Sequence, residues 1–172
     1  MSLLVHTVGH STRSADEFVA LLREFGIARI ADVRSIPRSR HNPQFNISLL
    51  PDWLSDAGIE YEHMPGLGGF RHTTPNSPNL GWYNEAFRGY ADYMQTPEFA
   101  VAIEHLVSEA RLSVVAVMCA EAVPWRCHRS LIGDALVVRG ILVNDIIGTG
   151  SARPHSLTAF AEVDGERLTY PS

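Results

Sequence analysis

The sequence contains no lysine, so all 14 of its basic residues are arginines. It also contains only two cysteines, Cys119 and Cys127, which are too few for the disulfide framework of a small secreted protein. No run approaches the roughly 20 apolar residues that a membrane-spanning helix needs, and the first residues lack the basic region and cleavage site of a secretory signal. We therefore expect a cytoplasmic protein that makes no contact with a membrane.

The 172-residue chain is 45% hydrophobic and has a formal net charge of −5. This is enough apolar material for one hydrophobic core, and no stretch resembles a linker, so we expect a single domain over residues 1–172. A net negative charge gives no overall attraction to nucleic acids or anionic membranes. Any anion-binding surface must therefore be a local cluster of arginines.

Short apolar runs alternate with amphipathic stretches along most of the chain. This pattern predicts an α/β fold with three layers, in which helices cover both faces of a mainly parallel, Rossmann-like or rhodanese-like sheet. Asp164-Gly165 predicts a closing hairpin between Ala161 and Tyr170. The expected strands are 3–8, 27–33, 59–64, 112–118 and 141–146, the expected helices are 14–25, 47–57, 85–95, 97–110 and 130–139, and the expected loops are 34–46 and 65–84.

Polar residues follow three of the predicted strands, which end at Val8, Val33 and Met118. If these strands are parallel, the loops that follow them emerge at one edge of the sheet, where open α/β folds bind ligands. We therefore expect the three loops to share a pocket. Their polar residues are His10, Ser11, Thr12 and Arg13, then Arg34, Arg38, Arg40 and His41, then Cys119, Glu121, Arg126, Cys127, His128 and Arg129.

Many of the arginines lie in or beside these loops. Guanidinium groups bind phosphate and carboxylate groups through two parallel hydrogen bonds, so we expect an anionic ligand, and a nucleotide or nucleic acid would also suit them. Equally, several could form structural ion pairs with Asp32, Glu60, Glu62 or Glu121. The candidate ligand-binding residues are Arg34, Arg38, Arg40, Arg71, Arg126, His128 and Arg129.

Cys119 ends an apolar run, where backbone amides and cationic neighbours can lower a thiol pKa and make a thiolate available as a nucleophile. Cys127 is a candidate relay or resolving thiol, and Glu121 and His10 are candidate acid, base or orienting groups. Alternatively, both cysteines only pack in the core.

A metal site would use Cys119, Cys127 and His128, with His10 or Glu121 as a fourth ligand. The usual Cys-x-x-Cys spacing of zinc sites is absent, however, and adjacent ligands at positions 127 and 128 fit one ion poorly. We therefore predict no metal and no cofactor, and keep a metal-supported site as an alternative.

Specific motifs are spread over nearly the whole chain. They are Val8-Gly9-His10-Ser11-Thr12-Arg13, Asp32-Val33-Arg34-Ser35 with Pro37, Ser39 and Arg40, Pro43 with Phe45-Asn46, Leu67-Gly68-Gly69 with Arg71, Phe87-Arg88-Gly89-Tyr90-Ala91-Asp92-Tyr93-Met94, and Met118-Cys119-Ala120-Glu121 through Cys127-His128-Arg129-Ser130. Together they resemble the bacterial domain of unknown function family numbered 488. The resemblance implies a compact α/β domain with these polar motifs, and it implies no particular activity.

A weaker resemblance is to rhodanese-like domains, which place Asp-Val-Arg after an early strand and a nucleophilic cysteine before an Arg-Ser that opens a helix. Residues 30–34 are similar to the first element, and Cys119 with Arg129-Ser130 is similar to the second. In rhodaneses the cysteine and the arginine are five positions apart, whereas Arg129 lies ten positions after Cys119 and Arg126 lies seven after it. The resemblance therefore leaves both persulfide transfer and phosphatase chemistry uncertain.

From these residues we expect a thiol-dependent enzyme, a transferase or hydrolase, that binds a phosphate-like, sulfur-oxyanion-like or nucleotide-like ligand at the carboxyl edge of the sheet. Cys119 is its candidate nucleophile. The alternative from another class is a binding module without catalysis, which recognises a nucleotide or nucleic acid and whose cysteines are structural. The sequence does not choose an oligomeric state.

Overall fold

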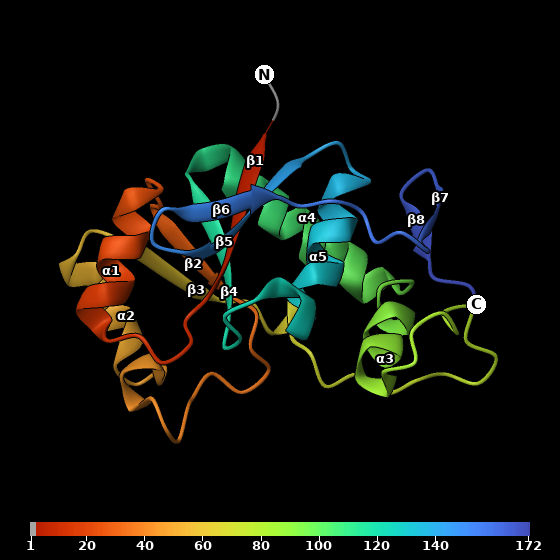
Figure 1. Cartoon of the computed structure of the whole chain (residues 1–172), viewed down its shortest axis with the longest axis horizontal. Coiled ribbons are helices and arrows are strands. Elements are labelled where there is room, and N and C mark those ends of the chain that lie inside the picture. Colours follow the sequence, from red (N-terminus) through yellow and green to blue (C-terminus); the bar gives the residue numbers. More distant parts are fainter. Residues whose placement is uncertain (1–2) are drawn as a thin grey trace.

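The computed structural model describes residues 3–172 and contains a six-stranded sheet with the order β3-β2-β4-β1-β5-β6 (Figure 1). Strands β1 to β5 are parallel, and only β6 runs antiparallel, beside β5. The strands are β1 (Leu4–Gly9), β2 (Arg29–Asp32), β3 (Glu60–His63), β4 (Val115–Cys119), β5 (Leu142–Gly148) and β6 (Ser151–Pro154). This arrangement confirms the predicted α/β fold with a mainly parallel sheet.

Helices cover both faces of the sheet, and each face has its own apolar core. Helices α1 (Ala15–Glu24) and α2 (Leu50–Asp56) pack on one face. Helices α3 (Glu85–Tyr93), α4 (Pro97–Leu112) and α5 (Arg129–Val137) lie on the other (Figure 1). The three predicted layers are therefore present.

Side chains alternate between these two cores along the central strands, because successive residues of a strand point to opposite faces. In β4, Val115, Val117 and Cys119 join the core beneath α3, α4 and α5, whereas Ala116 and Met118 join the core beneath α1 and α2. All five are buried. This alternation places the Cys119 thiol on the side of the sheet that α5 covers.

Capping residues explain where two of the helices start. Ser14 accepts a hydrogen bond from the backbone of Glu17, and the Glu17 carboxylate accepts one from the Ser14 backbone, which closes a capping box before α1. Thr96 caps α4, and Pro97 occupies its first turn, where the missing amide hydrogen costs nothing. The predicted boundaries of both helices are correct to within about two residues.

Three short 3₁₀ turns and one small hairpin complete the described elements. The turns are η1 (Pro43–Phe45), η2 (Pro65–Leu67) and η3 (Pro124–Arg126), and the hairpin strands are β7 (Glu162–Asp164) and β8 (Arg167–Thr169). The hairpin matches the sequence prediction, whereas β6 was not predicted. Over residues 3–172, no helix combines the length and the apolar character needed to cross a membrane.

Candidate functional site

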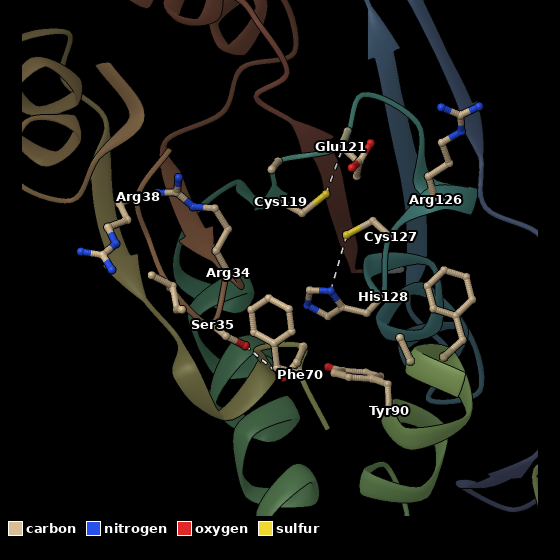
Figure 2. Close-up of a pocket in the computed structure, with 15 residues that line it drawn as sticks. Arg34, Ser35, Arg38, Phe70, Tyr90, Cys119, Glu121, Arg126, Cys127 and His128 are labelled. Atoms are coloured by element: carbon tan, nitrogen blue, oxygen red, sulfur yellow. Dashed lines mark hydrogen bonds between the residues drawn. The ribbon is translucent and has the colours of Figure 1, made fainter. Parts of the chain in front are cut away.

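A cavity of about 330 Å³ opens at the carboxyl ends of β2 and β4, beside the start of α3 (Figure 2). Its walls come from four stretches of the chain: the loops after β2 and β4, the segment after η2, and α3. It therefore lies at the sheet edge where the sequence predicted a shared pocket. The lining residues are Arg34, Ser35, Ile36, Arg38, Gly69, Phe70, Ala86, Phe87, Tyr90, Cys119, Ala120, Glu121, Arg126, Cys127 and His128.

Cys119 lies at the inner wall of this cavity with 1% of its surface exposed. Its Sγ accepts a hydrogen bond from Nε of Arg129 at 3.1 Å, and it lies 3.5 Å from the carbonyl oxygen of Glu121. Burial opposes ionisation of the thiol. Three influences outweigh burial: a hydrogen bond from Cys127, the positive charge of Arg129, and the hydrogen bonds with Glu121 and Arg129. The pKa of Cys119 therefore lies below the usual thiol value.

Cys127 is the second buried thiol, and Figure 2 shows its sulfur facing that of Cys119. Its Sγ lies 3.5 Å from Nδ1 of His128 and 3.5 Å from the backbone nitrogen of Arg129. The hydrogen bond to Cys119 and burial both raise the pKa of Cys127 well above the usual thiol value. The two cysteines are therefore unequal, with Cys119 as the more acidic thiol and Cys127 as the less acidic one.

The His128 ring is held in one orientation by the backbone. Its Nε2 lies 3.0 Å from the carbonyl oxygen of Val33, which can only accept a hydrogen bond, so Nε2 carries the hydrogen and Nδ1 is left as an acceptor. Burial lowers the pKa of His128 to about 4, so the ring is neutral at pH 7. The neutral ring therefore presents Nδ1 as a hydrogen-bond acceptor toward the Cys127 sulfur.

Arg129 is the largest fully buried side chain of the described residues, and it lies behind Cys119 rather than on the cavity wall. Besides the bond to Cys119, its NH1 donates to the hydroxyl of Thr7 at 2.6 Å, and its NH2 donates to the carbonyl oxygens of Glu121 and Ala122 at 3.1 Å each. Its hydrogen bonds thus reach one thiol, one hydroxyl and two carbonyl oxygens.

The loop between β4 and α5 can reach this position because it crosses the bare backbone of Gly9. A Cβ at Gly9 would lie only 1.6 Å from the carbonyl oxygen of Glu121. With this close approach the nine-residue loop 120–128 folds back on itself, and Arg129 lies next to Cys119. The spacing that departs from the rhodanese pattern therefore does not separate the cysteine from its arginine.

The hydrogen bonds to Cys119 differ from an anion cradle. The Sγ of Cys119 accepts from the Arg129 guanidinium and from the Cys127 thiol, and within residues 3–172 no backbone amide donates to it. Phosphate cradles depend on a set of amide donors around the bound anion. The donors at the Cys119 sulfur are instead side chains.

Arg34 lines the cavity, but much of its guanidinium is already engaged. It donates to both carboxylate oxygens of Asp32, at 2.9 and 2.7 Å, and to the carbonyl oxygen of Phe45 at 2.8 Å. Asp32 is fully buried and also accepts a hydrogen bond from Tyr61. The structural ion pair considered for Asp32 in the sequence is therefore formed.

His10 lies behind Arg34 and outside the cavity lining. Its ring stacks on Phe45 with 4.2 Å between the ring centroids, and its Nδ1 lies 2.8 Å from the carbonyl oxygen of Ser11. Burial lowers the pKa of His10 to about 4. The structure thus shows packing and orienting contacts for His10 and no direct access to the cavity.

Arg38, Arg126 and Glu121 are exposed residues at the rim of the cavity. Figure 2 shows the two guanidinium groups on opposite sides of the sulfurs, each pointing outward. Exposed side chains change rotamer within nanoseconds, so either arginine can turn toward a bound anion. These arginines, unlike Arg34, have free hydrogen-bonding capacity for a ligand.

The other two candidate arginines lie outside the cavity lining. Arg40 is exposed on the loop after β2. Arg71 lies 3.7 Å from the ring centroid of Tyr93 and donates to the carbonyl oxygens of Gly68 and Pro65. Its contacts hold the segment after η2 against α3, which shapes the cavity wall from behind.

Phe70 reaches the cavity with a φ of 51°, a left-handed conformation that is uncommon away from glycine, and it is 82% exposed. Sequence reasoning missed several residues that support the site from behind. Thr7 and Asp145 are buried polar residues inside apolar strands, and that mismatch with their neighbours was the available signal. His155 had no such signal, because it follows β6, which the sequence did not predict.

Possible metal ligands gather elsewhere in the described part of the chain. Glu62, His105 and Glu109 are the one group of at least three such side chains in residues 3–172 whose ligand atoms all lie within 4.8 Å of one another. Arg29 pairs with both glutamates, which reduces the attraction for a cation. Cys119, Cys127 and His128 do not form a group of this kind.

Comparison with known proteins identifies a family and no activity. The family model described as the domain of unknown function DUF488 matches residues 14–136, which is most of the chain. No curated protein and no solved structure matches the chain. The chain therefore belongs to the DUF488 family, as the sequence motifs indicated.

Proposed function

We propose that this member of the DUF488 family is a thiol-dependent enzyme, and that its Cys119 thiolate attacks an electrophilic atom of an anionic ligand bound in the cavity. One observation carries the proposal: the Cys119 sulfur lies 3.1 Å from the Arg129 guanidinium while it also borders a cavity of about 330 Å³. A thiol that only packs in a core has no need of a buried cation beside it.

The cavity walls favour a ligand with an apolar part and a negative group. Ile36, Phe87 and Tyr90 supply apolar and aromatic surface. Arg38 and Arg126 supply the positive charge, since they are exposed and Arg34 is paired with Asp32. A phosphate, a sulfur oxyanion or a nucleotide meets these requirements.

The two thiols fit the roles of nucleophile and resolving group. In the first step the Cys119 sulfur forms a bond to the electrophilic atom, and the leaving group departs with the electron pair of its broken bond. Where that atom is sulfur, Cys127 then attacks the Cys119 sulfur, a disulfide forms, and the transferred sulfur leaves as a sulfide. The proton of Cys127 leaves with the departing sulfur as HS⁻, and an external thiol reductant restores the two cysteines.

The test compares Cys119→Ser with Cys127→Ser in a panel of thiosulfate, phosphoester and nucleotide substrates. Product formation should be lost in Cys119→Ser, whereas Cys127→Ser should retain the first covalent step and lose the second. In the wild type, peptide-resolved alkylation by iodoacetamide should modify Cys119 well below the pH at which ordinary thiols react. Full turnover by Cys119→Ser, or two thiols that react only after denaturation, would support a binding module with structural cysteines instead.

A further inference from the structure

A chain of buried hydrogen bonds leads from Cys119 through the centre of the sheet. Arg129 donates to Thr7 at 2.6 Å, and Thr7 donates to Oδ1 of Asp145 at 2.5 Å. Oδ2 of Asp145 lies 2.8 Å from Nδ1 of His155. The chain of hydrogen bonds joins β4, α5, β1, β5 and the segment after β6, and Thr7 lies more than 100 positions before its other members.

Each hydrogen of this chain has a defined direction. An arginine can only donate, so the Thr7 oxygen accepts from Arg129 and its own hydrogen must go to Asp145. An ionised Asp145 accepts from both Thr7 and His155. Thr7 therefore connects a buried cation to a buried carboxylate through a single hydroxyl group.

His155 stands between two carboxylates, because its Nε2 lies 2.9 Å from Oδ1 of Asp134 while its Nδ1 faces Asp145. Burial opposes protonation of the ring, but the hydrogen bonds and charges of the two carboxylates outweigh it and raise the pKa of His155 to about 9. The ring is thus a cation at pH 7. It packs on Gly133 of α5, where a Cβ would lie 2.9 Å from the ring.

His155 shares its one positive charge between two carboxylates, and uncharged donors also stabilise that of Asp134. Asp134 also accepts hydrogen bonds from Tyr170 at 2.7 Å and from the hydroxyl of Thr158 at 2.6 Å. Arg153 of β6 lies over the ring of Trp125, 4.8 Å from its centroid. The charged groups that face His155 directly are therefore one carboxylate from β5 and one from α5.

We propose that His155 is a positioning residue for Cys119: by balancing the charge of Asp145, it leaves the Arg129 guanidinium directed at the Cys119 thiolate. Without a cation at position 155, Arg129 is the positive charge that the hydrogen-bond chain links to Asp145, through the single hydroxyl group of Thr7. The negative charge of Asp145 would then attract the Arg129 guanidinium and weaken its electrostatic interaction with the Cys119 sulfur. This role rests on the proposed function, since it concerns the same nucleophile.

The experiment measures the pH dependence of Cys119 alkylation by iodoacetamide, resolved by peptide mass spectrometry, in the full-length wild type and three variants. His155→Gln removes a positive charge and should raise the midpoint for Cys119 by about one pH unit, which slows alkylation at pH 7 by up to about tenfold. Asp145→Asn removes a negative charge and should shift the midpoint in the opposite direction. Tyr170→Phe is the matched control, because it removes only the hydrogen bond to Asp134 and keeps the charges of His155 and Asp145. It should leave the midpoint unchanged.

If His155 had a merely structural role, His155→Gln and Asp145→Asn would shift the alkylation midpoint of Cys119 in the same direction, and that outcome would overturn the proposal. If His155→Gln fails to fold, an unchanged or raised midpoint in Asp145→Asn overturns it as well. The proposed function fails separately, and visibly, if wild-type Cys119 titrates as an ordinary thiol. A low wild-type midpoint that neither variant moves leaves the nucleophile in place and removes only His155 from its support.

Discussion

Two buried arginines, Arg34 and Arg129, follow neighbouring strands of the same sheet, yet their surroundings differ. Arg34 is 7% exposed and pairs with the carboxylate of Asp32, so one full negative charge balances it. Arg129 is fully buried, and its hydrogen bonds go to uncharged carbonyl and hydroxyl oxygens and to the sulfur of Cys119. The charge of Arg34 is neutralised by a carboxylate, whereas the charge of Arg129 is available to stabilise a thiolate.

The comparison shows why counting arginines in the polar loops was a coarse guide to the site. A guanidinium that already holds a carboxylate adds little net charge to a cavity, whereas one surrounded by neutral acceptors keeps its charge for the next anion. For Arg129 the proposed next anion is the Cys119 thiolate, and the proposed role of His155 is to keep Asp145 from competing with it.

Replacing Arg129 should have the largest effect. Arg129→Met removes the cation beside Cys119, so the alkylation rate of this thiol at pH 7 should fall about 10- to 100-fold. It also leaves several buried acceptors unpaired, at about 1–3 kcal/mol of unfolding free energy each. Peptide-resolved alkylation and urea unfolding measure the two effects. Arg129→Lys keeps the charge but not the planar guanidinium, so its alkylation rate and its unfolding free energy should lie between those of the wild type and Arg129→Met. An unchanged alkylation profile in Arg129→Met would contradict the role given to this residue.

Replacing Arg34 should separate stability from reactivity. Arg34→Met leaves the buried Asp32 carboxylate without its cation, which should cost about 3–5 kcal/mol of unfolding free energy. The alkylation midpoint of Cys119 should move much less than in Arg129→Met, because Arg34 makes no hydrogen bond to the thiol, whereas Arg129 donates to it directly. Urea unfolding and the alkylation assay together check this. If Cys119 slows as much as in Arg129→Met, the two arginines do not differ in the way the structure indicates.

The pH dependence of stability should distinguish the two sides of the site. The folded pKa of His155, about 9, is above its ordinary value of 6.5, so its contribution to stability is complete below pH 6.5 and is lost as the pH rises toward 9. The melting temperature of the wild type should exceed that of His155→Gln by a few degrees at pH 6, and this difference should shrink by pH 9. A difference that stays constant over this range would show that the ring is not charged.

His10 and His128 should act in the opposite direction. Their pKa values fall to about 4 in the fold, so the stability they contribute is complete above pH 6.5 and is lost as the pH falls toward 4. His10→Asn, on the Arg34 side, should therefore lose less stability than the wild type between pH 6.5 and pH 4. Thermal unfolding at both pH values, with the neutral-pH melting temperature of each protein as its own reference, measures this.

The exposed arginines at the rim should have the smallest effects. Arg38→Ala and Arg126→Ala should each change the unfolding free energy by less than about 0.5 kcal/mol, because neither side chain is buried. Each should weaken the protection of Cys119 by pyrophosphate about 3- to 10-fold, the loss expected for one charged hydrogen bond of about 1 kcal/mol. Arg40→Ala, outside the cavity lining, is the matched control. Equal protection in all three variants would mean that the anion binds elsewhere.

The sequence predicted the sheet well because its strands are short apolar runs with clear ends. The exception, Ser151–Pro154, is polar and ends in proline, and such a segment forms a strand only because the edge of β5 is there to receive it. The pocket was predictable in part, since parallel strands present their following loops at one edge: the loops after β2 and β4 share it, whereas the loop after β1 contributes no lining residue. Its cysteines, Arg34, Arg38, Arg126, Glu121 and His128 all line one cavity.

The finer arrangement could not be read from the sequence. Whether an arginine holds a carboxylate, a thiol or solvent depends on contacts between residues far apart in the chain. Thr7 and Asp145 are 138 positions apart and meet because β1 and β5 are neighbours. For the same reason Arg129, expected to bind a ligand, lies behind the nucleophile, and His10, expected in the pocket, stacks on Phe45.

Gly9 links the reactivity of Cys119 to the order in which the sheet assembles. Strand β1 is made first but lies in the middle of the finished sheet, between β4 and β5, and its bare end is the surface that the cysteine loop crosses. Cys119 meets Arg129 and Thr7 only after that strand has been enclosed by segments more than 100 residues later. If Cys119 is alkylated rapidly at low pH as proposed, this reaction reports that the sheet is complete. Measuring it at intervals during refolding would show when the central strand β1 is incorporated.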